Sequence, residues 1–361
     1  MVSALTIIGG CPTFDDNMPS EKYMEEIKTS AVRSERYGFS AMLVYSDHQQ
    51  FDPWLAANCL MNSTKKLSPL VAVQPLYTHP FTVAKLVASL SLVHDRPVHL
   101  NFISGGFPHD LEAFCDATTH DQRYERVAEY GEIVRNLLST GRPISYSGAH
   151  YQVSGLHLRM AARIKPDCAP MFTISGSSSA GKTVARRLGA RAIEYLRPVR
   201  DYDGKPRPEG IEYGTRLGIV SRARAQDAWA VACSRYPDDE LGREMREYYT
   251  RVSDSVWVKE LGAEVTVPAG HPYWLGPYKN GHASCPFLVG SREDIARELI
   301  GYFKMGLRTF LLDDPPEDED AFEIQSVFAM AEEAFASGIS DNLPEKEMRL
   351  GSGRDVGSQR I

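Results

Sequence analysis

This 361-residue sequence has no excess of basic residues and no long apolar run. Lys and Arg number 40 against 47 Asp and Glu, which gives a net charge of −7 at pH 7. A face that follows nucleic-acid phosphates is therefore not expected, and nucleic acid is not a predicted partner. No stretch of about 18 apolar residues occurs, so no membrane-spanning helix or membrane partner is predicted. The apolar N-terminal stretch lacks the basic start of a signal peptide and predicts a strand.

Cysteine is scarce and scattered. The six cysteines form no CxxC or CxxH cluster, so a zinc site is not predicted and no metal is expected. Widely spaced cysteines are typical of a reducing compartment, and we predict a cytoplasmic protein. They are Cys11, Cys59, Cys115, Cys168, Cys233 and Cys285.

Several well-known catalytic motifs are missing as well. The sequence contains no HExxH, no Walker phosphate loop and no Ser-His-Asp nucleophile pattern. No GxGxxG follows the first apolar strand, which disfavours a dinucleotide-binding fold. A bound cofactor is therefore expected to supply the chemistry.

What the sequence does contain is an alternation of short apolar strands and amphipathic helices. Such alternation over about 330 residues predicts a parallel α/β sheet with right-handed crossovers. A closed (β/α)8 TIM barrel and an open doubly wound sheet both fit, and eight units favour the barrel. The predicted strands are 5–8, 41–45, 70–74, the apolar part of 97–107, 171–174, 190–195, 212–220 and 307–312.

The predicted helices carry local start signals. Asp52 precedes Pro53 at the start of one helix, and Thr119 with Gln122 forms a capping box at the start of another. Ser20 and Ser291 are also predicted N-caps. The helices are expected at 20–37, after residue 53, at 78–96, 119–138, up to 188, and at 224–251, 291–305 and 320–336.

Two features depart from the alternation. Residues 144–146 and 150–153 predict a β-hairpin inserted after the fourth helix. Residues 197–210 are rich in Pro, Gly, Asp and Arg, so the helix after the sixth strand is expected to be shortened or missing. Residues 271–286 predict a loop. We predict one barrel domain over residues 1–336 and a polar C-terminal tail over 337–361.

The stretch 97–107 combines a buried strand with a polar, glycine-rich turn. Alternation along the strand puts His99, Asn101 and Ile103 on one face. Asn101 and Ser104 therefore lie near the carboxyl end of a strand, where α/β barrels place their chemistry. An ordinary turn with a hydrogen-bonded asparagine explains the same residues equally well.

A serine-rich turn at 176–179 lies between a strand and a helix. Free amides, hydroxyls and the helix dipole at such a position suit a phosphate, although simple capping by serine is a common alternative. Tyr124, in the first turn of its helix, could reach the same phosphate or face the core.

Two ionisable residues are candidate catalytic groups. His48 follows the second strand, where it could act as a general acid or base or as a hydrogen-bonded loop residue. Arg216 lies in the middle of a strand, and a buried arginine needs either a carboxylate or a bound anion. Arg197 and Arg200, in the irregular loop, could face solvent.

The segments Asn-Phe-Ile-Ser-Gly-Gly at 101–106, His-Asp-Gln-Arg-Tyr-Glu at 120–125 and Ser-Gly-Ser-Ser at 175–178 carry a resemblance. In this order they resemble bacterial-luciferase-like flavin monooxygenases, most closely the alkanesulfonate and dimethylsulfone monooxygenases. The likeness extends over residues 5–220 and returns at 289–312. It implies a (β/α)8 barrel that takes reduced FMN from a separate flavin reductase. It further implies that O2 forms a C4a-(hydro)peroxyflavin, which oxygenates a small organic molecule.

The resemblance also implies residue roles. Asn101 and Ser104 would lie near the isoalloxazine ring, and Tyr124, Ser177 and Ser178 would hold the FMN phosphate. His48 and Arg216 would be the catalytic pair, with Arg216 binding the substrate anion. The implied cofactor-binding set is Gln74, Asn101, Ser104, His120, Tyr124, Gly176, Ser177 and Ser178.

The sequence departs from the sulfonate enzymes at two single positions, in the shortened region 197–210, and in the aromatic insertion before the last strand, which carries Tyr273, Trp274 and Tyr278. Gln50 stands where they have a cysteine, and Gly218 where they have a histidine. The substrate is therefore open between a sulfonate or sulfone and another small molecule. A deazaflavin-dependent oxidoreductase of the same fold and a non-catalytic flavin-binding protein are the alternatives, and a homodimer or homotetramer is expected.

Overall fold

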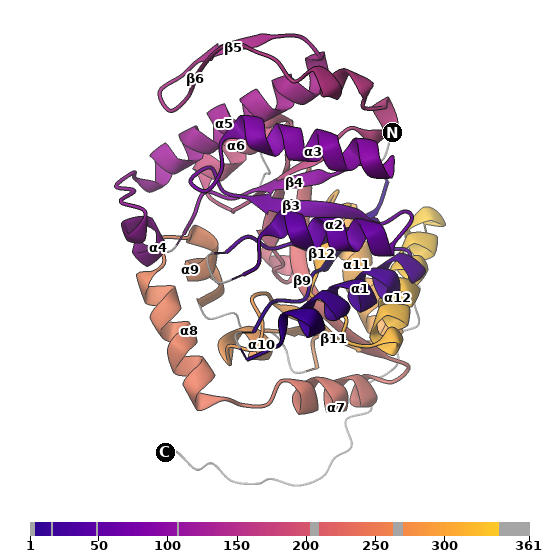
Figure 1. The fold of residues 1–361 in the computed structure, drawn as a ribbon. Coiled ribbons are helices and arrows are strands. Elements are labelled where there is room, and N and C mark those ends of the chain that lie inside the picture. The colour runs from indigo at the N-terminus through magenta and orange to yellow at the C-terminus, as the bar shows by residue number, and fades with distance from the viewer. Residues whose placement is uncertain are drawn as a thin grey trace, which may run out of the picture.

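A closed barrel of parallel strands forms the centre of the molecule (Figure 1). The computed structural model describes residues 4–15, 17–47, 50–106, 108–202, 209–262 and 270–338. Within these residues, β9 pairs with both β12 and β8, which closes the ring and confirms the barrel over the open sheet. The barrel strands, in ring order, are β1 (Thr6–Gly10), β2 (Ala41–Val44), β3 (Ser68–Val73), β4 (His99–Phe102), β7 (Phe172–Ser175), β8 (Arg191–Tyr195), β9 (Tyr213–Arg222) and β12 (Thr309–Leu312).

Helices surround this barrel and begin at the predicted signals. Asp52 accepts from the Trp54 amide, and Thr119 and Ser291 both form capping boxes, although the N-cap of the first helix is Pro19 and not Ser20. The α-helices are α1 (Ser20–Arg36), α2 (Pro53–Ser63), α3 (Pro80–His94), α4 (Pro108–Ala113), α5 (His120–Thr140), α6 (Ser179–Leu188), α7 (Ala225–Arg235), α8 (Glu240–Val252), α9 (Val256–Gly262), α10 (Gly276–Lys279), α11 (Arg292–Lys304) and α12 (Asp318–Ala336). The short 3₁₀ helices are η1 (Arg159–Arg163), η2 (Pro166–Cys168) and η3 (Val199–Tyr202).

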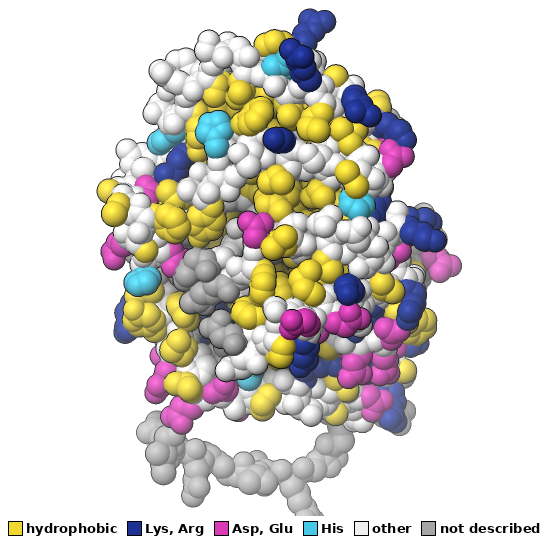
Figure 2. Space-filling model, in the orientation of Figure 1, with side chains coloured by type: hydrophobic (Ala, Val, Ile, Leu, Met, Phe, Trp, Pro, Cys, Tyr) yellow, Lys and Arg dark blue, Asp and Glu magenta, His cyan; other side chains and the backbone are white. Residues whose placement is uncertain are grey.

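The outer helices divide into a buried and a charged side, as α1 illustrates. Its Tyr23, Ile27 and Ala31 are buried, whereas Lys22 and Lys28 pair with glutamates one turn away on the outer side. Figure 2 shows charged side chains gathered at the lower right, over α1 and α12. None of the described helices is both long and apolar enough to cross a bilayer.

Two apolar layers follow from the alternation of side chains along the strands. The larger layer lies between strands and helices and includes Leu100, Phe102 and Val127. The smaller layer fills the barrel interior and consists of Ile8, Ala41, Leu43, Leu70, Ala72, Ile193 and Leu311. At the amino end of the strands, Arg191 donates hydrogen bonds to Thr6 and Thr309 at 3.1 Å each, which fills that end with polar contacts.

Two strands, β10 (Tyr273–Trp274) and β11 (Phe287–Ser291), were missed by the sequence analysis. Residues 271–286 were predicted as loop, but β10 and α10 form there, and β11 follows. β11 pairs in parallel with the carboxyl half of β9, from Gly218 to Arg222, after β12 has paired with the amino half. The reason is that β9 is longer than its barrel neighbours, so its second half needs another partner for its backbone groups.

The region from 224 to 251 also differs from the prediction. It contains two helices, α7 and α8, separated by a break at residues 236–239 that includes Pro237. Proline has no amide hydrogen and cannot continue the helix, which explains the break.

The insertion after α5 is an antiparallel hairpin of β5 (Ile144–Ser147) and β6 (Gln152–Leu156). Its turn is fixed by Glu129, whose carboxylate accepts hydrogen bonds from three successive backbone amides at 149–151. Between β8 and β9, the 3₁₀ helix η3 is the helical element of the described residues, and 203–208 lie outside them. Of the predicted tail, residues 339–361 lie outside the described part of the chain.

Candidate active site at the carboxyl end of the barrel

A cavity of about 740 Å³ opens at the carboxyl ends of the barrel strands. Residues that end or follow seven of those strands, together with Arg216 within β9, contribute to its wall, as expected for a (β/α)8 barrel. Its wall divides into two halves of different chemistry. The uncharged half consists of Gln74, Asn101, Ser104, Tyr124 and Ser175, and the charged half consists of Tyr45, Tyr195, Arg216, Asp313 and Asp314.

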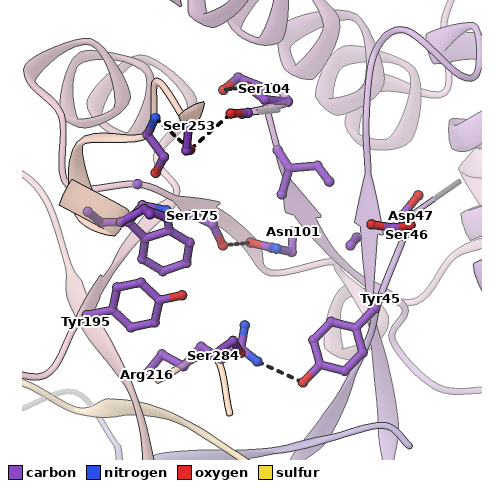
Figure 3. Close-up of a pocket in the computed structure, with 18 of the residues that line it drawn as sticks. Tyr45, Ser46, Asp47, Asn101, Ser104, Ser175, Tyr195, Arg216, Ser253 and Ser284 are labelled. Carbon is purple, nitrogen blue, oxygen red and sulfur yellow. Dashed lines mark hydrogen bonds between the residues drawn. The ribbon is translucent and has the colours of Figure 1, made fainter. Parts of the chain in front are cut away.

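Asn101 is the centre of the uncharged half. Its Oδ1 atom accepts a hydrogen bond from Thr173 Oγ1 at 2.7 Å. It accepts a second from Ser175 Oγ at 3.0 Å, which Figure 3 shows. The side chain is only 3% exposed. No described residue accepts from its Nδ2 amino group, so this donor remains for a ligand.

Two glycines, Gly105 and Gly176, leave the backbone of the uncharged half accessible because they have no side chain. Gly176 has φ +150°, and a Cβ there would collide with the Tyr124 hydroxyl. Gly105 has φ +82°, and a Cβ would lie 3.0 Å from Nε2 of Gln74. Burial raises the pKa of Tyr124, and hydrogen bonding to Ser104 and Ser178 opposes the shift. The turn residues and Tyr124 therefore form one contiguous surface.

The serine turn at the amino end of α6 already holds a carboxylate. Ser177 Oγ donates to Glu260 Oε2 at 2.9 Å, and Glu260 also pairs with Arg197 at 2.6 Å. Ser178 is the N-cap of α6 and accepts from the Gly181 amide at 3.1 Å. Capping by Ser178 is therefore observed, and an anion lies beside the same helix end.

Arg216 dominates the charged half. Its Nη2 donates to the Tyr45 hydroxyl at 3.0 Å, and the two side chains point toward one another from opposite walls in Figure 3. No carboxylate of a described residue lies within the 4.0 Å of an ion pair with Arg216. The guanidinium is partly exposed to the cavity, so its remaining donors can meet a ligand.

Asp313 and Asp314 directly follow β12 and also belong to the charged half. Burial raises the pKa of Asp313, and the nearby Arg216 opposes that shift. Burial also raises the pKa of Asp314, to about 7, although its Oδ1 accepts from Ser30 Oγ at 2.6 Å. Burial raises the pKa of Tyr45 and of Tyr195 as well, so both phenols are neutral at pH 7.

Residues 253–258 form one wall of the cavity and are held in place by aromatic and polar contacts. Trp257 of α9 stacks on Tyr195 with ring centroids 3.6 Å apart. Ser253 Oγ donates to the Gly106 carbonyl at 3.1 Å, and Asp254 pairs with the buried Arg123. The segment before α9 is thus fastened to the loop after β4, which places an aromatic wall beside Arg216.

The cavity brings together nine residues singled out from the sequence. They are Gln74, Asn101, Ser104, His120, Tyr124, Gly176, Ser177, Ser178 and Arg216. His48 lies outside the described residues, while Asp47 and Gln50 on either side line the cavity. The roles of all ten residues stay predictions.

The two single-residue departures from the sulfonate enzymes have structural explanations. Gln50 exchanges hydrogen bonds with both backbone groups of Phe14, so it joins the loops after β1 and β2. A Cβ atom at Gly218 would lie 2.3 Å from the ring of Phe287 of β11, so this ring occupies the space that a side chain would need.

Sequence reasoning missed Tyr45, Tyr195, Trp257, Asp313 and Asp314. Asp313 and Asp314 directly follow the last predicted strand, and polar residues at that position were the available signal. Among the described residues, no group of three or more His, Cys, Asp or Glu side chains could hold a metal ion.

Comparison with known proteins assigns the family. The fold and this two-sided cavity define a barrel enzyme with its site at the carboxyl end of the strands. The model of the luciferase-like monooxygenase family matches residues 10–309. The chain therefore belongs to the luciferase-like monooxygenases, which confirms the resemblance.

A relative and two solved structures are similar over most of the chain. The 4-(gamma-L-glutamylamino)butanoyl-BtrI acyl-carrier protein monooxygenase BtrO of Niallia circulans is 29% identical over 328 residues, 88% of this chain and 95% of BtrO. EDTA monooxygenase EmoA from Chelativorans sp. BNC1 superposes with a TM-score of 0.66 at 16% identity, covering 92% of this chain and 95% of EmoA. An F420-dependent secondary alcohol dehydrogenase superposes with a TM-score of 0.62 at 15% identity, covering 91% and 99%. At such identities the two structures establish the fold alone.

Proposed function

We propose that this protein is a two-component monooxygenase that uses reduced FMN and O2 to oxygenate a small organic molecule. The observation that carries the proposal is the shared cavity, in which an uncharged wall, an anion-holding helix end and an unpaired arginine meet. A separate flavin reductase would supply the reduced cofactor.

The uncharged half suits the flat flavin ring. Asn101 has a free amide donor, and the loop after β4 is kept bare by Gly105, so a ring can approach the backbone closely. Asn101, Ser104 and Gln74 would contact the ring. Gln74, Asn101 and Ser104 offer uncharged hydrogen-bonding groups, which suit a neutral ring system, while Asp110 and Asp254 also line the cavity.

The serine turn suits the phosphate. Ser177, Ser178 and Tyr124 lie at the amino end of α6, where backbone amides and the helix dipole favour an anion. The carboxylate of Glu260, which accepts a hydrogen bond from Ser177, supports this placement of a negative charge. A bound phosphate would replace Glu260 and gain Arg197 as a counter-ion.

When bound, the reduced flavin supplies two electrons to O2, so that one oxygen atom enters the substrate and the other leaves as water. The chain's own residues bind, orient and exclude water. Trp257 and Tyr195 form the dry wall, and Arg216 orients an anionic group of the substrate. His48, which lies outside the described residues, is proposed as the general acid or base.

The name of BtrO records a γ-glutamyl substrate attached to an acyl-carrier protein. A γ-glutamyl group carries a free amine and a free carboxylate. A substrate of this kind, free or attached to a carrier, is compatible with the unpaired Arg216, and a sulfonate or sulfone remains the other candidate.

A deazaflavin-dependent oxidoreductase is the second candidate, because a deazaflavin dehydrogenase shares the fold. Anaerobic titration of the purified chain separates the two. Reduced FMN is expected to bind in the micromolar range or tighter, and riboflavin, which lacks the phosphate, about ten-fold or more weakly.

Oxygen is then admitted together with a panel of sulfonates, sulfones and amino-acid derivatives, and products are identified by mass spectrometry. Incorporation of one atom from ¹⁸O2 supports the proposal. Binding of reduced deazaflavin without binding of FMN would replace it by the second candidate, and binding of neither would reject both. FMN binding without any oxygenated product would favour a non-catalytic flavin-binding protein.

A further inference from the structure

The charged half contains an arginine and an aspartate that face the cavity without forming an ion pair. Arg216 of β9 is level with Leu311 of β12, and Asp313 lies two residues further along the same face. Leu311 belongs to the apolar layer inside the barrel, so alternation directs Asp313 inward as well. The Asp313 amide donates to the Leu217 carbonyl at 3.0 Å, which fixes its backbone on β9.

The side chains of both residues have unused hydrogen-bonding capacity. Arg216 donates to the neutral Tyr45 hydroxyl, and the carboxyl group of Asp313 has no hydrogen-bond or ion-pair partner among the described residues. The two side chains lie further apart than the 4.0 Å limit of an ion pair. They are nevertheless close enough that Arg216 opposes the burial-driven rise in the pKa of Asp313, and Asp313 helps to raise the pKa of Arg216 against the effect of burial. Buried charges without partners are costly, so a ligand that satisfies both is favoured.

The neighbouring charged side chains of the described residues are engaged elsewhere and do not pair with Arg216 or Asp313. Asp314 is engaged by Ser30. Arg246 donates to the Tyr278 and Ala283 carbonyls at 3.0 and 2.8 Å and lies over the Tyr278 ring. The guanidinium of Arg216 and the carboxyl group of Asp313 are therefore the groups that this part of the cavity presents to a ligand.

We propose that Arg216 and Asp313 bind the zwitterionic amino-acid head of the substrate, with the carboxylate on Arg216 and the ammonium group on Asp313. The rest of the substrate extends past Tyr195 toward Asn101, whose side chain lies on the adjoining wall in Figure 3. This inference rests on the proposed oxygenase function and names its substrate class. It explains why a strand-borne arginine and a strand-end aspartate face one another without closing an ion pair.

Three matched probes test the proposal on the full chain: L-norvaline, pentanoate and butylamine. They share an alkyl chain and carry both charged groups, the carboxylate alone and the amine alone. By isothermal titration, with and without FMN, L-norvaline is expected to bind at least about ten-fold more tightly than either single-charge probe. Equal affinities, or no binding of any probe, would overturn the proposal without the need for a variant.

Variants assign the two contacts. Asp313→Asn is expected to reduce L-norvaline affinity to that of pentanoate while leaving pentanoate binding intact. Arg216→Gln is expected to weaken both carboxylate probes and spare butylamine. Asp318→Asn, at a surface residue that pairs with Arg36 away from the cavity, should retain the preference for L-norvaline. Loss of the preference in Asp318→Asn, or its retention in Asp313→Asn, would contradict the assignment.

FMN titration of the same samples separates this inference from the proposed function. FMN binding without a preference for L-norvaline rejects the zwitterion site and leaves the oxygenase proposal standing. A preference for L-norvaline without FMN binding rejects the oxygenase proposal and retains the amino-acid site.

Discussion

The two halves of the cavity satisfy their polar groups in different ways. In the uncharged half, Asn101 is held by Thr173 and Ser175, and the hydroxyl of Ser178 caps a helix. In the charged half, Arg216 and Asp313 remain unpaired with each other. A wall that is largely complete in itself suits a cofactor of fixed shape, whereas unpaired charges indicate that the ligand brings the partners. The following experiments test this contrast.

The largest effect is expected from Gly176→Ala. The position has φ +150°, and a new methyl group would collide with the Tyr124 hydroxyl. Strain and overpacking together should lower the free energy of unfolding by about 3–5 kcal/mol and weaken FMN binding. Chemical denaturation and flavin titration measure both.

Gly189→Ala is the matched control. It also has positive φ, +58°, but no heavy atom lies within 4 Å of the added methyl group. Its cost should be about 1 kcal/mol, with FMN affinity unchanged. Equal losses in the two variants would show that the uncharged half does not depend on the bare backbone at 176.

Asp314→Asn tests the charged half through pH. The pKa of Asp314 is raised from 3.8 to about 7 in the folded protein. A raised carboxyl pKa means that stability is fully present below pH about 4 and is lost as pH rises toward 7. The variant lacks this titration, so its stability relative to the wild type should rise by about 2–4 kcal/mol between pH 4 and pH 8. Denaturation curves that change in parallel over this range would contradict the burial of a charge here.

Two threonine substitutions compare β7 with β9. Thr173→Val removes a donor to Asn101 and should cost about 1–2 kcal/mol. Thr215→Val removes a buried hydroxyl that has no hydrogen-bond partner among the described residues, so it should be neutral or stabilising. A larger loss at 215 than at 173 would contradict the hydrogen bond from Thr173 to Asn101 as a source of stability.

The smallest effect on stability is expected from Glu260→Gln. The pair of Glu260 with Arg197 is partly exposed, so its loss should change the free energy of unfolding by less than about 1 kcal/mol. FMN affinity should rise several-fold because a negative charge leaves the proposed phosphate position, while riboflavin affinity stays constant. An equal gain for riboflavin would place the phosphate elsewhere.

The sequence allowed the barrel and the uncharged half to be predicted because both depend on local patterns. Apolar alternation marks the strands, and the capping box at Thr119 marks the start of α5. Asn101 could be placed at a strand end from the short segment around it.

The charged half could not be predicted in the same way. Asp313 and Asp314 have the pattern of ordinary loop residues, and only the closing of the ring brings Asp313 near Arg216. β11 was missed because its five residues run directly into the helix capped by Ser291, and its role depends on the extra length of β9. These features depend on contacts between residues far apart in the chain.

The double attachment of β9 limits how this enzyme can adapt. β9 is hydrogen-bonded to β8 and then β11 on one edge and to β12 on the other, so Arg216 stands on an anchored strand. Laboratory evolution toward a new substrate should accordingly accept few replacements along β9. Acquired changes should instead accumulate in Tyr45 and Trp257, which approach the arginine from segments outside that strand.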